Sequence, residues 1–247
     1  MSDKFNPASR VATFFEAALR EQSGTAALQA WCSVFGIQSQ EQREQITLLH
    51  RNLALLSGEL DLVLEQVNSR VAGAPGRYEG ALERARAAIT VVDLSPQFQQ
   101  YKQYISHDQT NLFHIISDQT PDEERVDQDA PDDVMDMVGE LRDYAENHLE
   151  GQFRAFVLRQ VDIIAEAIGR YPIIGQRAFS DGANATLANL IENREVYEHP
   201  PDEEAKGKFK RLVKRFLTLA PERAAQIAQV INAVNSFKEL TSGGGGS

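Results

Sequence analysis

The sequence predicts an all-α fold, a multi-helix bundle of about eight or nine helices, and three observations support this. Apolar residues recur at intervals of three and four along most of the chain, which is the period of amphipathic helices. Glycine and proline separate these segments, as breakers between helices do. No stretch alternates with the period of two that is typical of a half-buried strand. The longest helical segment, near 40–71, also carries a heptad pattern.

The chain has 247 residues, of which 42 % are apolar. This length is enough for one large helical domain or two smaller ones, each with its own core. We expect an N-terminal helical bundle over 1–118, an acidic loop or linker over 119–131, and a C-terminal helical bundle over 132–240. The last residues, 241–247, end in GGGGS, which is typical of an engineered linker scar.

The N-terminal bundle is expected to contain five helices bounded by caps and breakers. Asn6-Pro7 is typical of a cap followed by proline at the first helical position, and Gly36 is expected to end the second helix. Ser95-Pro96 is expected to open a single helix that continues to the end of this part. The expected ranges are 7–23, 28–35, 40–71, 78–92 and 96–118.

The second half of the chain begins with a segment that has no helical pattern. QTPDEERVDQDA, residues 119–130, contains one aliphatic residue, Val126, and predicts an exposed loop or linker. A helix over 131–171 follows, with Gly151 as the point where it bends or splits. We expect a connection over 173–182 and then three more helices, over 185–197, 202–219 and 221–240.

Charge is distributed unevenly along the chain. Residues 118–150 contain 13 acidic and two basic residues, which accounts for the whole net charge of −11. The remainder is neutral, so the acidity is local. Binding to phosphate backbones requires a basic field, and a general affinity for nucleic acid is therefore unlikely.

The long helix carries two apolar rows. Its heptad seam is formed by Ile46, Leu49, Leu53, Leu56, Leu60, Val63 and Val67. The second row is formed by Leu48, Leu55 and Leu62, and a polar row containing Glu59 separates the two. A two-stranded coiled coil requires only the seam, so the helix is predicted to lie between two neighbours. Either both neighbours belong to this chain, or the second row meets another subunit or another protein.

KGKFKRLVKRF, residues 206–216, is the one basic cluster. Its basic face comprises Lys208, Lys210, Arg211, Lys214 and Arg215. This composition is typical of helices that lie on membranes or bind phosphates. We favour an ordinary bundle helix as the explanation, since acids at its start and cations near its end suit the helix dipole. The basic face and the acidic stretch are also expected to attract each other, within a molecule or between molecules.

A metal site is the main catalytic alternative, and it would use His107, Asp108, His114 and Asp118. His114 and Asp118 are four residues apart and share a helix face. His107 and His114 lie roughly 10 Å apart along a continuous helix, so both reach one ion only if the helix breaks between them. The sequence lacks the Glu-x-x-His, His-Glu-x-x-His and phosphate-loop motifs of common metal and nucleotide sites. We therefore expect no cofactor.

These observations favour a non-catalytic helical interaction protein: a scaffold, adaptor or regulatory subunit. Leu48, Leu55 and Leu62 are the predicted interface, and the partner is another protein or a second copy. The alternatives are a metal-dependent helical enzyme, or a membrane-surface or nucleic-acid binder that uses 206–216. No apolar run suggests a signal peptide or a membrane span, and Cys32 is the only cysteine. A cytoplasmic location is expected.

Overall fold

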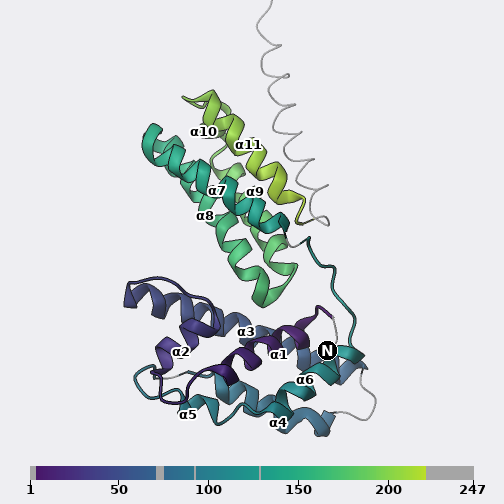
Figure 1. The fold of residues 1–247 in the computed structure, drawn as a ribbon. Coiled ribbons are helices and arrows are strands. Elements are labelled where there is room, and N and C mark those ends of the chain that lie inside the picture. Colours follow the sequence, from purple (N-terminus) through teal and green to yellow (C-terminus); the bar gives the residue numbers. More distant parts are fainter. Residues whose placement is uncertain (1–3, 71–74, 92, 128, 221–247) are drawn as a thin grey trace, which may run out of the picture. The chain divides into compact units, whose positions relative to one another are not determined.

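The computed structural model describes residues 4–70, 75–91, 93–127 and 129–220 (Figure 1). Within this part the chain is helical, with one isolated bridge between Ala26 and Gln97 and no strand. The all-α prediction is confirmed. The described helices are α1 Pro7–Arg20, α2 Ala27–Val34, α3 Gln42–Arg70, α4 Pro75–Ile89, α5 Gln99–Lys102, α6 His107–Gln119, α7 Asp129–His148, α8 Gly151–Ile174, α9 Arg177–Glu192, α10 Arg194–Glu198 and α11 Glu203–Leu217.

The chain divides into two compact units. The first contains the described residues up to Arg125 together with Pro172–Gly175. The second contains residues 126–171 and the described residues from Gln176 onward. The predicted helix over 221–240 and the linker scar over 241–247 lie outside the described residues.

In the first unit, α3 contacts α1, α2, α4 and α6. Aromatic pairs join other elements of the unit: Phe15 of α1 meets Phe113 of α6 edge to face with ring centroids 5.7 Å apart, and Trp31 of α2 meets Phe98, the residue before α5, in the same way at 5.3 Å. All four are fully buried. Burying each such side chain contributes on the order of 2–3 kcal/mol before entropy is counted, so these contacts stabilise the packing of the shorter helices on one another.

In the second unit, α11 packs against α7 and α9. Its Phe209 ring meets Phe156 of α8 at 5.4 Å and Tyr197 of α10 at 5.9 Å. Nearer its C-terminal end, Phe216 meets Phe179 of α9 at 6.2 Å. The apolar side of α11 is therefore part of a core built by all the other helices of the unit.

The predicted single helix over 96–118 is wrong. It forms two helices, α5 and α6, and Ser106 caps the second by accepting a hydrogen bond from the Gln109 backbone amide at 3.2 Å. The chain therefore breaks before His107, and α6 runs without interruption through His107 and His114.

Of two further boundaries, one agrees with the prediction and one differs from it. The expected helix over 131–171 splits into α7 and α8 at Gly151, the position predicted for a bend or split, and its φ of +62° suits glycine. The expected connection over 173–182 does not exist in that form. Pro172 lies inside the last turn of α8, Gly175 follows with φ of +59°, and α9 begins at Arg177. Splits of this kind explain why the described part has more helices than predicted.

Candidate functional site

The two apolar rows of α3 differ in burial. Six of the seven seam residues, Leu49, Leu53, Leu56, Leu60, Val63 and Val67, are buried in the first unit, and Ile46 is partly buried. Leu48, Leu55 and Leu62 are only partly buried. The seam is therefore filled by the chain's own helices, whereas the predicted interface row keeps part of its apolar surface exposed. These three leucines, called the leucine row below, form an apolar strip along one helix.

The polar row between the seam and the leucine row contains a buried carboxylate, that of Glu59. Glu59 is 0 % exposed, and Arg10 of α1 is 3 % exposed. The Arg10 guanidinium donates to Glu59 Oε2 through Nε at 2.9 Å and through Nη2 at 2.5 Å. A buried carboxylate requires such a partner because its desolvation is costly. Sequence reasoning identified Glu59 as part of a polar row but missed Arg10, whose signal is an arginine among the apolar residues of α1.

Arg10 also forms an ion pair with the acidic segment that follows α6. Arg10 Nη1 donates to Glu123 Oε2 at 2.6 Å and Nη2 donates to Glu123 Oε1 at 3.1 Å. The Glu123 amide also donates to the Phe5 carbonyl at 2.7 Å, and the Phe5 amide donates to Asp122. The first part of the predicted loop 119–131 is thus bound to the N-terminal residues, and Thr120 is buried.

On α11, the apolar face of the predicted amphipathic helix is wholly inside the second unit. These buried residues are Phe209, Leu212, Val213, Phe216 and Leu217. A helix that binds a bilayer through such a face must insert its apolar side chains. With that face in the core, α11 presents only its charges to the surroundings.

The basic face divides into paired and exposed cations. Lys208 Nζ lies 3.5 Å from Glu204 and 5.3 Å from the centre of the Tyr144 ring, and Arg215 pairs with Asp133 of α7 at 2.6 Å. Lys210, Arg211 and Lys214 are exposed, and no ion pair joins them to another described residue. These three residues are called the basic stripe below.

The start of α11 is fixed by Asp202. Its carboxylate accepts from the Ala205 amide at 2.9 Å and from the Tyr144 hydroxyl at 2.9 Å. The Ala205 hydrogen bond is the main reason why the pKa of Asp202 lies below its usual value, and the Tyr144 hydroxyl adds to this lowering. The same contact with Asp202 raises the pKa of Tyr144 to about 12. The cluster joins α7 to α11 and has a structural role.

The predicted metal ligands lie on α6 in the first unit. His107, Asp108 and Asp118 are exposed. His114 is partly buried, and its Nε2 lies 2.8 Å from Oε1 of Glu16 on α1. The helix does not break between the two histidines. In the part of the chain that the structure describes, no group of three or more His, Cys, Asp or Glu side chains is arranged to hold a metal ion.

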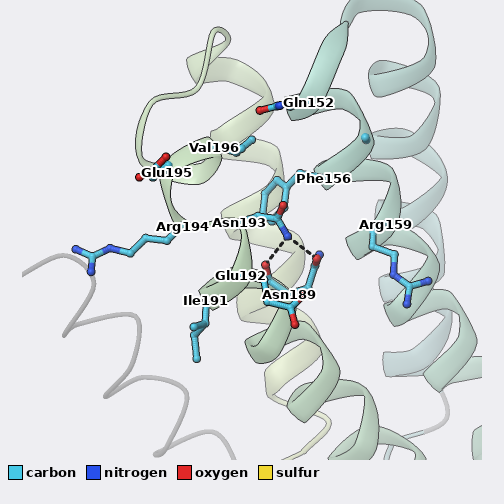
Figure 2. A pocket seen from close by; sticks show the side chains of 11 residues that line it. Gln152, Phe156, Arg159, Asn189, Ile191, Glu192, Asn193, Arg194, Glu195 and Val196 are labelled. Carbon is cyan, nitrogen blue, oxygen red and sulfur yellow. Dashed lines mark hydrogen bonds between the residues drawn. The ribbon is translucent and has the colours of Figure 1, made fainter.

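A groove of about 760 Å³ lies on the second unit between α8, the end of α9, and α10 (Figure 2). Phe156, which is almost fully buried, and the exposed Ile191 supply its apolar surface. Asn193 Nδ2 donates to the backbone oxygen of Asn189 at 3.0 Å and to its Oδ1 at 2.8 Å, which braces the turn. The charged lining residues are Arg159, Glu192, Arg194 and Glu195. Because both signs of charge line the groove, it does not select one class of ligand. Sequence reasoning missed it because no local pattern marks it.

Two further findings bear on the class of protein. Within the described ranges, none of the helices combines the length and the hydropathy that a bilayer crossing requires. Comparisons of this chain with protein-family models, with curated proteins and with solved structures gave no match.

Proposed function

We propose that this chain is a non-catalytic interaction protein, a scaffold, adaptor or regulatory subunit, that binds a protein partner or a second copy through the leucine row of α3. One observation supports this most directly: Leu48, Leu55 and Leu62 keep apolar surface exposed along a helix whose other row is already filled. Aligned apolar positions on one helix are a common way to receive a partner helix.

The surrounding residues fit this proposal. The buried seam and the Arg10–Glu59 ion pair hold α3 firmly in the first unit, so the leucine row is presented on a rigid rod. A rigid surface loses less entropy on binding than a mobile one. The proposal includes a cytoplasmic location, for which the single, buried Cys32 is the supporting feature.

The test compares three aspartate substitutions on neighbouring positions of α3. Leu53→Asp introduces a charge at a buried position and is expected to unfold the protein, because an unpaired buried charge is very costly. Leu55→Asp is expected to leave the fold intact and to remove the association made through the leucine row. Ala54→Asp, at an exposed position, is the matched control and should change neither property.

Circular dichroism reports the fold of each variant, and size exclusion coupled to light scattering reports its mass. A partner protein is identified by cross-linking in the native host, with wild type and Leu55→Asp compared side by side. If Leu55→Asp unfolds the chain as Leu53→Asp does, or if it retains every association of the wild type, the leucine row is not an interface.

A further inference from the structure

The outer face of α7 carries a stripe of unpaired acids. Asp136, Glu140 and Asp143 are exposed, and no described residue forms an ion pair with them. They stand at positions i, i+4 and i+7, so they follow one another along one side of the helix over roughly 10 Å. The only cation on α7, Arg142, is already paired with Asp162 of α8 at 2.8 Å. These three residues are called the acidic stripe below.

The basic stripe of α11 has a matching pattern in the same unit. Lys210 and Lys214 are one helical turn apart, roughly 6 Å along the axis, and Arg211 lies beside Lys210. Asp136 and Glu140 have the same spacing on α7. Two helices laid along each other would therefore bring Lys210 and Lys214 opposite Asp136 and Glu140, with Arg211 to one side of Lys210. Within the molecule, one cation of α11 already pairs with one acid of α7, Arg215 with Asp133.

Within one molecule the two stripes do not pair, although α7 and α11 pack together. Each molecule consequently exposes the basic stripe and the acidic stripe on the same compact unit. We propose that the basic stripe of one copy docks on the acidic stripe of α7 in a second copy of this chain. The contact joins different surfaces on the two partners, so it either forms twice about a two-fold axis in a dimer or continues head-to-tail into a ring or a filament.

A second copy fits the basic stripe better than a polyanion does. The stripe offers three cations, and Glu203 and Glu204 stand at the beginning of the same helix. The net charge of −11 repels a second copy as well as nucleic acid and anionic vesicles, so it does not decide between them. The acidic stripe supplies two carboxylates, Asp136 and Glu140, at the spacing of Lys210 and Lys214. Exposed ion pairs contribute little individually and are screened by salt, so the association should be weak and confined to low ionic strength.

The experiment reverses the charges of each stripe in a separate variant and measures the association of the variants by sedimentation velocity. One variant carries Lys210→Glu, Arg211→Glu and Lys214→Glu, and the other carries Asp136→Lys, Glu140→Lys and Asp143→Lys. The wild type is expected to show a sedimentation coefficient that rises with concentration at about 20 mM NaCl and no longer rises at about 300 mM. Each variant alone should lose this salt-dependent rise, and their equimolar mixture should show it again at low salt.

Recovery in the mixture is the decisive result. Both variants remain acidic overall, so net charge alone does not bring them together. Reversal of Arg154 and Arg159, two exposed cations of α8, is the control and should leave association unchanged. A wild type that stays monomeric at low salt, or a mixture of folded variants that fails to associate, overturns the proposal. Leu55→Asp should retain this salt-dependent association, which separates it from contacts made by the leucine row.

Discussion

At the scale of single residues, the ion pairs of Arg10 carry the largest desolvation cost in the described structure. Removing a carboxylate and a guanidinium from water costs several kcal/mol for each, and only close hydrogen bonds offset it. Glu59 obtains these from Arg10, and Glu123, whose side chain is 30 % exposed, supplies a second carboxylate to the same guanidinium. The three side chains connect α1, α3 and the segment after α6, so the stability of the first unit depends on the arginine.

Arg10→Met should destabilise the first unit by about 3–5 kcal/mol, because it leaves the Glu59 carboxylate buried without a partner. The measurement is urea unfolding followed by circular dichroism. Glu123→Gln is the comparison within the same network. It should cost much less, since Glu123 is partly exposed and Arg10 keeps its hydrogen bonds to Glu59.

The double variant Arg10→Met with Glu59→Leu tests whether the loss comes from the unpaired charge. It should be markedly more stable than Arg10→Met alone, because apolar side chains of similar volume replace a buried ion pair with little loss. Equal stability of the single and double variants would contradict this account of the network.

Asp202 gives a prediction that depends on pH. Asp202→Ala should lower stability by about 1 kcal/mol at neutral pH, which is typical for the loss of an N-cap. The folded pKa of Asp202 lies below its usual value because the Ala205 amide donates to the carboxylate. The contribution is therefore present above the unfolded pKa of about 3.9 and is lost as the pH falls through the folded pKa.

Thermal unfolding of the wild type and Asp202→Ala between neutral and acid pH measures this contribution. The difference between their midpoints should shrink at the acid end. Asp202→Asn serves as the control, since asparagine caps helices well and does not titrate. A difference that stays constant down to the lowest pH would show that the carboxylate charge plays no part.

At the scale of elements, close approach of three helices in the second unit depends on Gly182 of α9. A Cβ atom at this position would lie 2.5 Å from the Ala167 Cβ of α8 and 2.9 Å from the Phe216 ring of α11. Gly182→Ala should therefore destabilise the unit by about 1–3 kcal/mol, as overpacking does. Unfolding in denaturant gives the value.

Gly169 supplies the matched control on α8. It lies inside the helix, and a Cβ atom there would meet nothing within 4 Å. Gly169→Ala should stabilise the protein by about 0.5–1 kcal/mol, because alanine has the higher helix propensity. If both substitutions stabilise the protein, the tight packing at Gly182 is not limiting.

Helix type was easier to predict than helix boundaries. Long periodic segments such as α3 were recognised because burial of one face imposes the period. The break between α5 and α6 was missed, since Ser106 caps α6 without a nearby glycine or proline. Tyr171-Pro172 was interpreted as the end of α8. However, proline in a last turn removes only one backbone hydrogen bond there, and the left-handed Gly175 is the actual terminator.

The sequence predicts which side of a helix the candidate residues share, but it does not predict which residues they contact. The spacing of Leu48, Leu55 and Leu62 establishes that they share a side of α3, yet their partial exposure depends on which helices cover that side. In the same way, the sequence indicates a basic face on α11, but the pairing of Arg215 with Asp133 joins residues 82 positions apart. Tertiary pairing of this kind has no local signal.

At the scale of the whole molecule, acidity concentrated on one segment weakens the folded state in low salt. Asp132, Asp136 and Glu140 follow one another at i, i+4 on α7 and are exposed. Like charges at this spacing are unfavourable by about 0.2–0.5 kcal/mol per pair. The net charge of −11 adds repulsion over longer distances. Salt screens these interactions, whereas it hardly affects the buried Arg10–Glu59 pair.

The unfolding midpoint of the dilute monomer should therefore rise by about 2–4 °C between about 10 mM and about 150 mM NaCl. Asp136→Lys replaces two repulsive pairs on α7, with Asp132 and with Glu140, by attractive pairs. It should therefore raise the unfolding midpoint in low salt and reduce the change of the midpoint with salt. Differential scanning calorimetry of both proteins at several concentrations separates this effect from self-association. If the wild-type midpoint falls with salt, exposed ion pairs outweigh the repulsion on α7. The repulsion within the acidic stripe would then contribute little to the free energy of unfolding, and exposing the stripe would not destabilise the monomer.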